Sequence, residues 1–275
     1  MHEEPFEREE RRLIDEALAS EPIKNTFRLS WEFLRLNKQL TLTVMALLLV
    51  LSLLGMTIPL VGVIFTVLSS ALSISMQIYI GRLVYESQDI QQFVSQIKVA
   101  KGEHILKAFF SPAMGAYMGW MVLSLLFLVM IGSIAGAIGV PQINLEESLA
   151  LQNEKEIMEF LSVIAIPTLL LFLLLLLIQP LIQFKIIKAE SFNQGFFAVM
   201  SFFSLRAWRR LFRWSYLRYI FSIFGIAMLY MVGLFLLMTI PMVNYIAIIL
   251  GFYVWMILLS VASVMVERIL EYEGV

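Results

Sequence analysis

Residues 40–80 read LTLTVMALLLVLSLLGMTIPLVGVIFTVLSSALSISMQIYI, a run without a single charged side chain. Most of its residues are Leu, Val, Ile or Met, and Pro59 lies near its middle. A helix needs about 20 such residues to cross the hydrocarbon layer of a bilayer. The run is long enough for two spans, 40–58 and 60–80, and proline suits the first turn of the second helix. We therefore predict a transmembrane helical hairpin.

Four more apolar segments follow, at 118–138, 160–178, 219–240 and 242–266. Of the 275 residues, 60% are apolar and 15% are charged, whereas a soluble domain carries about a quarter charged residues. The predicted fold class is thus all-α: a polytopic membrane protein with six transmembrane helices arranged as three hairpins. We expect cytoplasmic interfacial helices between the hairpins. Residues 1–38 would form a cytoplasmic amphipathic segment, and residues 39–275 a single transmembrane domain.

The basic residues predict the orientation, because Lys and Arg near the ends of spans are retained in the cytoplasm. Six spans place both termini on one side, and 19 of the 20 bases fall in segments on that side. Only Lys155 lies opposite, in an acidic connection. We predict cytoplasmic termini and, since no removable signal peptide is recognisable, a bacterial inner-membrane protein. The same rule also holds in eukaryotic membranes.

Two hairpin turns have nearly the same sequence: MTIPLV at 56–61 and MTIPMV at 238–243. A basic amphipathic stretch with a tryptophan precedes each hairpin, and an arginine follows each, Arg82 and Arg268. This pattern predicts three parallel units, each an amphipathic helix followed by a hairpin. The alternative is that apolar hairpins with Thr-Ile-Pro turns resemble one another by chance.

Three features also suggest a known family. They are the aromatic segment SWEFLRLNK at 30–38, the proline turns, and the polar segments between the hairpins. Together they resemble the six-helix bacterial inner-membrane proteins of the YciC type, and the membrane domains fused to some glycerophosphodiester phosphodiesterases. The resemblance covers most of the chain as a pattern and includes no catalytic domain. It implies a fold and a location, and it implies no activity.

The spans offer little catalytic chemistry. Their centres contain no Asp, Glu, Lys, Arg or His, and intramembrane charge is the usual mark of a proton or ion path. The chain has no cysteine, and its two histidines are far apart. We therefore expect no enzyme activity, no cofactor and no metal site. The polar residues Gln77, Gln179 and Asn244 would form a polar notch, unless they only mediate helix packing.

The strongest positive signal lies between Ser191 and Arg218, where arginines alternate with aromatic residues. We predict an interfacial helix that contacts anionic lipid, with its apolar side among acyl chains and its guanidinium groups among phosphates. The predicted lipid-contact residues are Arg206, Arg209, Arg210, Arg213, Trp208 and Trp214. The alternative is that this segment only fixes topology and anchors the fifth span. Nucleic acid is an unfavourable partner, because the bases lie at the membrane surface and the net charge is −1.

Residues 3–20 alternate so that apolar side chains share one helix face, which predicts a helix that docks on the membrane or on a partner protein. Two functions are compatible with the whole sequence. The first is a non-enzymatic scaffold, assembly factor or envelope-homeostasis component in contact with anionic lipid. The second is a transporter or permease for a lipid-like or uncharged substrate. A cavity at mid-membrane lined by polar residues would favour the second.

Overall fold

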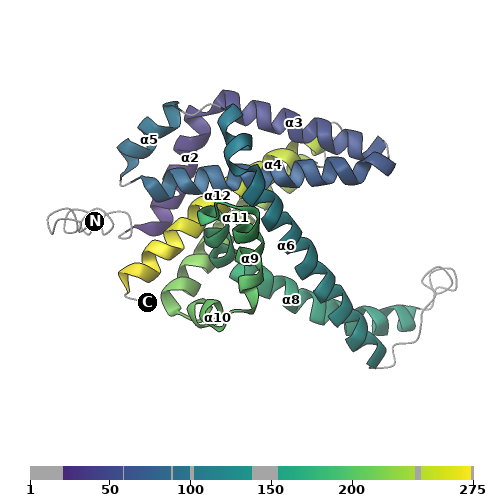
Figure 1. Ribbon diagram of the computed structural model, residues 1–275. Helices are drawn as coiled ribbons and strands as arrows, with labels where there is room; N and C mark the ends of the chain where they lie inside the picture. The colour runs from purple at the N-terminus through teal and green to yellow at the C-terminus, as the bar shows by residue number, and fades with distance from the viewer. Residues whose placement is uncertain are drawn as a thin grey trace.

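The computed structural model describes residues 21–57, 59–87, 89–99, 102–137, 154–238 and 243–273, and within these residues every regular element is helical (Figure 1). This confirms the all-α prediction. The residues predicted to form the N-terminal amphipathic helix, 3–20, lie outside the described part of the chain. The helices are α2 (Pro22–Leu36), α3 (Lys38–Thr57), α4 (Pro59–Glu86), α5 (Ile90–Val99), α6 (Gly102–Ala137), α8 (Glu154–Lys188), α9 (Phe192–Met200), α10 (Leu205–Leu211), α11 (Trp214–Met238) and α12 (Val243–Tyr272).

Six of these helices are long and apolar enough to cross a membrane, as predicted. Pro59 begins α4, directly after α3, so the first hairpin has the proline position that the sequence predicts. The second proline turn, at Pro241, lies outside the described residues. The candidate spans are Lys38–Gly55, Gly62–Glu86, Ile105–Ser133, Thr168–Lys188, Trp214–Phe235 and Tyr245–Tyr272.

Two helices are longer than the sequence predicts. The third predicted span begins at residue 118, but α6 begins at Gly102 and contains Pro112. The fourth ends at residue 178 in the prediction, but α8 continues past Pro180 to Lys188. The prediction followed the most apolar residues only. A helix satisfies its own backbone hydrogen bonds and can therefore include less apolar residues, and it tolerates proline where neighbouring groups compensate.

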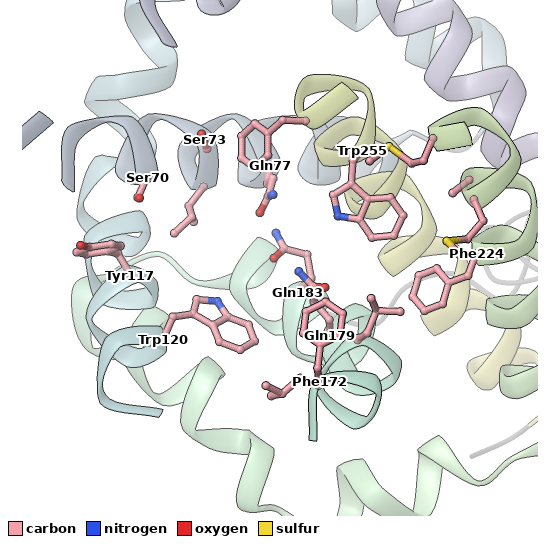
Figure 2. A pocket seen from close by; sticks show the side chains of 17 residues that line it. Ser70, Ser73, Gln77, Tyr117, Trp120, Phe172, Gln179, Gln183, Phe224 and Trp255 are labelled. Carbon is pink, nitrogen blue, oxygen red and sulfur yellow. The ribbon is translucent and has the colours of Figure 1, made fainter. Parts of the chain in front are cut away.

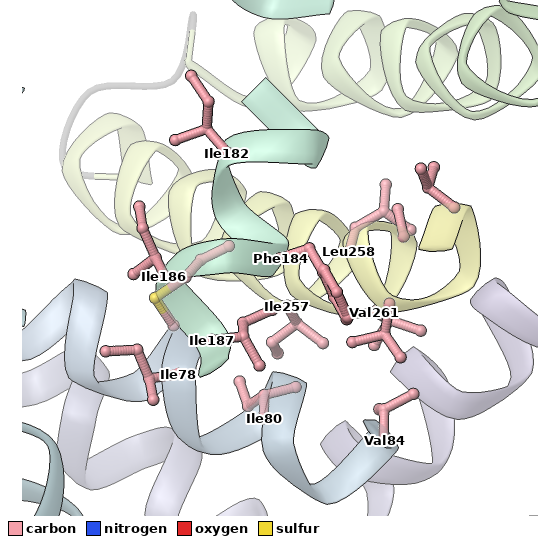
Figure 3. Close-up of a cluster of buried hydrophobic side chains, with 14 of the residues drawn as sticks. Ile78, Ile80, Val84, Ile182, Phe184, Ile186, Ile187, Ile257, Leu258 and Val261 are labelled. Carbon is pink, nitrogen blue, oxygen red and sulfur yellow. The ribbon is translucent and has the colours of Figure 1, made fainter. Parts of the chain in front are cut away.

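The core lies between α4, α8 and α12, each of which is the second helix of its hairpin. These three helices contact one another pairwise, and they contribute the side chains of the buried cluster in Figure 3. Between apolar helices in lipid the stabilising force is tight van der Waals packing rather than removal of apolar surface from water. β-branched side chains suit this role because they are stiff. The cluster includes Ile78, Ile80, Val84, Ile182, Ile186, Ile187, Ile257 and Val261, all fully or almost fully buried.

The other helices surround this core in a cyclic order. The first helix of each hairpin packs beside it: α3 on α4, α6 on α4 and α8, and α11 on α12. The short helix before each hairpin contacts the second helix of the preceding hairpin: α5 contacts α4, α10 contacts α8, and α2 contacts α12. In Figure 1 the α3–α4 and α6–α8 hairpins diverge from a common end. The short helices thus follow a three-fold order, whereas the contact of α9 with α6 has no counterpart of similar extent among the described residues of the other two units, and the repeat stays a prediction.

The closest backbone approach joins α9 to α6. A Cβ added to Gly195 would lie 2.1 Å from the carbonyl oxygen of Pro112, and one added to Gly115 would lie 1.9 Å from that of Phe192. Gly119 of α6 faces Val199 of α9 in the same contact. Only glycine fits at these positions, so α9 is held against α6 by its backbone. Gly132, further along α6, has open space around it.

Candidate functional site

Two arginines cap helix ends at one end of the bundle. Arg82 of α4 donates from Nε to the carbonyl of Ile187 over 3.0 Å and from Nη2 to that of Ala189 over 2.8 Å. Arg268 of α12 donates from Nη2 to the carbonyls of Val84 over 3.0 Å and Ser87 over 2.8 Å. The last carbonyls of a helix lack partners inside it and carry partial negative charge, so a cation there is doubly favourable. We call this end, marked by Arg82, Lys185, Arg210 and Arg268, the base-rich end.

Arg210 is also bound within this end. Its Nη1 lies 2.9 Å from each carboxylate oxygen of Glu267, and the two side chains are only 18% and 12% exposed. Lys185 and Arg206 line the same small cavity of about 230 Å³. Glu267 is the only acid among the residues described as lining that cavity, so one carboxylate lies beside three cations. Arg210 thus ties α10 to α12, a role that the sequence analysis did not foresee.

The other predicted lipid-contact residues differ in exposure. Arg206, Arg209 and Arg213 are exposed, and Trp214 is 77% exposed. Trp208 is half-buried: its Nε1 donates to the carbonyl of Phe202 over 2.7 Å, and the two rings meet edge to face. The same segment carries exposed apolar side chains, and they are Phe197, Phe203, Leu205 and Phe212.

The predicted continuous interfacial helix is wrong in its shape. Between Ser191 and Arg218 the chain forms α9, a 3₁₀ turn at Ser201–Phe203, the short helix α10, and then the start of α11. Arg213 therefore lies in the break between α10 and α11 and is not part of a helix with Arg206 and Arg209. Local hydrogen bonds begin the first piece: the Ser191 hydroxyl accepts from the Gln194 amide, in the manner of an N-cap.

A larger cavity lies within the membrane-spanning part, between α4, α6, α8, α11 and α12. Its volume is about 790 Å³, which is within the range of pockets that hold one small ligand. Aromatic and aliphatic side chains form most of its wall (Figure 2). The lining residues are Ser70, Ser73, Ile74, Gln77, Tyr117, Trp120, Phe172, Leu175, Leu176, Gln179, Gln183, Phe224, Ala227, Met228, Met231, Phe252 and Trp255.

Three glutamine amides gather in this cavity. Gln77 of α4 and Gln179 of α8, both predicted for the polar notch, line it together, and Gln183 of α8 joins them (Figure 2). The side chain of the third predicted residue, Asn244, lies outside the described part of the structure. The sequence analysis ended the fourth span at residue 178. It named Gln179, directly after that end, and missed Gln183, one helical turn further on. The signal was present, since residues four apart share one helix face and Gln183 follows Gln179 by that interval.

The fold and these two features define an integral, polytopic α-helical membrane protein with an intramembrane cavity and an end rich in arginine. No family model, curated protein sequence or solved structure matches the chain. Its function is therefore argued from its own residues.

Proposed function

We propose that the protein is a non-enzymatic membrane protein that contacts anionic lipid at its base-rich end, in a scaffold, assembly or envelope-homeostasis role. The observation that carries the proposal is the exposed surface formed by Arg206, Arg209, Arg213 and Trp214, with Leu205 and Phe212 beside them. Leu205 and Phe212 are 76% and 72% exposed, which is unfavourable in water and favourable among acyl chains.

Lipid phosphates are the partners that this surface fits. An exposed guanidinium group binds phosphate through paired N–H donors, and a basic residue near an anionic membrane gains about 1 kcal/mol. The base-rich end also carries the caps from Arg82 and Arg268, which hold α4 and α8 in place beneath it. The lipid surface thus lies on and beside α10, which contacts one of the helices that these arginines cap.

The location is part of the same proposal. The charge asymmetry supports a cytoplasmic base-rich end, and the resemblance to proteins of the YciC type supports a bacterial inner membrane. The segment at 3–20 would dock there on the membrane or on a partner protein.

The test is lipid co-purification followed by native mass spectrometry. In one variant, Arg206, Arg209 and Arg213 are all replaced by Gln. The matched control replaces Arg28, Lys38 and Lys107, which are also exposed cations, by Gln. We expect the first variant to lose bound phosphatidylglycerol or cardiolipin and the control to retain it. Equal retention by both variants, or equal loss from both, would show that the surface around α10 is not a lipid site.

A second candidate function is a permease for a lipid-like or uncharged substrate, and the 790 Å³ cavity favours it. The cavity lies among the middle parts of the spans and has both apolar walls and amide groups. The test is reconstitution into liposomes and measurement of the leaflet exchange of a fluorescent, uncharged single-chain lipid. We expect the protein to accelerate exchange and Ser70→Trp, which fills the cavity, to abolish the acceleration. Exchange at the rate of protein-free liposomes would exclude this function.

A further inference from the structure

The 790 Å³ cavity contains a polar group that lacks a partner. Gln183 is only 2% exposed, and its side-chain Nε2 has no hydrogen-bond partner within the described residues. A buried donor without a partner is unfavourable, because it has lost its hydrogen bonds to water. Ser73, which also lines the cavity, donates its own hydroxyl to the carbonyl of Ser69 in its own helix over 2.8 Å. The amide of Gln183 is therefore ready to donate to a ligand in the cavity.

Gln77 and Gln179 form a cluster of amides together with Gln183. Figure 2 shows the amides of Gln77, Gln179 and Gln183 close together at the centre of the cavity, from α4 on one side and α8 on the other. A primary amide has two N–H donors and one carbonyl acceptor. Three such groups can bind both a carbonyl and a hydroxyl of one ligand. They thus recognise a group that both donates and accepts hydrogen bonds.

The ligand's polar group carries no net charge. None of the described residues that line the cavity is Asp, Glu, Lys, Arg or His. Burying a phosphate or a carboxylate without a cation would cost far more than amides can return. The base-rich end is the part of the protein suited to phosphate, and its cations line a different cavity.

The remaining wall suits one acyl chain. Trp120 of α6 and Trp255 of α12 lie on opposite sides of the amide cluster, and Leu175 and Leu176 of α8 complete an apolar surface. The cavity opens to the bilayer, because the lining residues Phe172, Met228 and Phe252 are 60%, 68% and 47% exposed on helices that span the membrane. A lipid molecule can therefore enter sideways without crossing water.

We propose that the cavity binds one uncharged single-chain lipid of the monoacylglycerol type. Its ester and hydroxyl groups contact Gln77, Gln179 and Gln183, and its acyl chain lies along the apolar wall to one side of these amides. The proposal deepens the second candidate function by naming its substrate class, and it is independent of the phosphate contact proposed for the arginines.

The experiment is a native mass spectrometry titration of the full-length purified protein. The probes are 1-monooleoylglycerol and 1-oleoyl-lysophosphatidate, which differ only in a phosphate. We expect wild-type protein to bind one monooleoylglycerol and to bind the lysophosphatidate at least about tenfold more weakly at the cavity. Gln183→Leu should raise the Kd for monooleoylglycerol about tenfold, and Ser70→Trp should abolish binding. Gln39→Leu, an exposed amide on α3, is the matched control and should bind as wild type does.

Folding is checked by the thermal midpoint. Gln183→Leu should unfold no earlier than wild type, because it replaces an unpartnered amide with an apolar side chain of similar size. In the variant with Arg206, Arg209 and Arg213 replaced, equal affinity for both probes would contradict the proposal that the cavity ligand is uncharged. Wild-type affinity for monooleoylglycerol in Gln183→Leu would contradict the proposed amide contact. Wild-type affinity in Ser70→Trp would overturn the cavity as the site. The variant with Arg206, Arg209 and Arg213 replaced should keep full affinity for monooleoylglycerol, which separates this proposal from the anionic-lipid surface.

Discussion

Arg268 donates a hydrogen bond from Nη2 to the carbonyl oxygen of Ser87 over 2.8 Å, although 181 residues separate them in the chain. The same nitrogen also donates to the carbonyl of Val84. Arg82, on the helix that Arg268 caps, in turn caps α8. The ends of α12, α4 and α8 are thus connected in series by two guanidinium groups.

Replacing Arg268 by Leu should destabilise the protein by about 2–3 kcal/mol, because buried carbonyls at the end of α4 would lose a charged donor. The measurement is the thermal unfolding of purified protein in detergent. Arg209→Leu, which removes an exposed cation from α10, is the control and should change stability by less than about 0.5 kcal/mol. Equal midpoints for the two variants would contradict the capping role.

The effects of replacing Arg210 and Glu267 on the free energy of unfolding should depend strongly on each other. Both side chains are mostly buried, so removal of one leaves a poorly solvated charge, and the coupling in a double-mutant cycle should exceed about 1 kcal/mol. The cycle compares Arg210→Met, Glu267→Gln and the double variant by thermal unfolding. The pair of Arg35 with Glu32, three residues apart on α2, is more exposed and should couple by less than about 0.5 kcal/mol. Additive effects of Arg210→Met and Glu267→Gln would mean that the pair contributes nothing.

Gly195→Ala should separate α9 from α6. The new Cβ would lie 2.1 Å from a backbone oxygen that cannot rotate away, and overpacking of this kind costs about 1–3 kcal/mol. Gly132→Ala is the matched control in the same pair of helices: it meets open space and should leave stability unchanged or raise it by up to about 1 kcal/mol. The assay is again thermal unfolding. A Gly195→Ala variant as stable as Gly132→Ala would contradict the close contact of the two backbones.

The orientation can be tested with single cysteines, because the chain has none. Glu190→Cys lies in an exposed position at the base-rich end, and Lys155→Cys lies in the connection predicted on the opposite side. In intact bacterial spheroplasts a membrane-impermeant maleimide should label Lys155→Cys and should label Glu190→Cys only after lysis. The reverse pattern would place the base-rich end outside the cytoplasm.

The six spans were predictable from sequence because apolar length is a direct requirement of the bilayer. The start of α4 at Pro59 was also predictable, because the proline ring fits the first turn of a helix and disturbs a helix interior. The ends of α6 and α8 were not, because Pro112, Pro180 and the polar residues near them interrupt the apolar pattern but do not interrupt the helices. Hydropathy indicates which residues lie in lipid, whereas the backbone hydrogen bonds within the helix determine where the helix ends.

The roles of the arginines depended on tertiary contacts. Sequence placed Arg206, Arg209, Arg210 and Arg213 together as lipid ligands, yet Arg210 pairs with a carboxylate 57 residues later. Nothing in the local pattern distinguishes it from Arg209, its exposed neighbour. The cavity was half predictable: Gln77 and Gln179 stood out as polar residues in apolar spans, whereas the closeness of α4 and α8 that brings them together comes from packing alone.

The position of α12 has a consequence for biosynthesis. This helix is the last in the sequence, and it packs against α4 and α8, which are made long before it. Chains emerge from the ribosome at roughly 5–20 residues per second, so the first two hairpins wait for many seconds in the membrane with their inner faces uncovered. The bundle can close only after α12 has been synthesised. A ribosome that stops before α12 therefore releases a chain whose first two hairpins are inserted but whose inner faces are uncovered, which is a form that we expect membrane proteases to degrade.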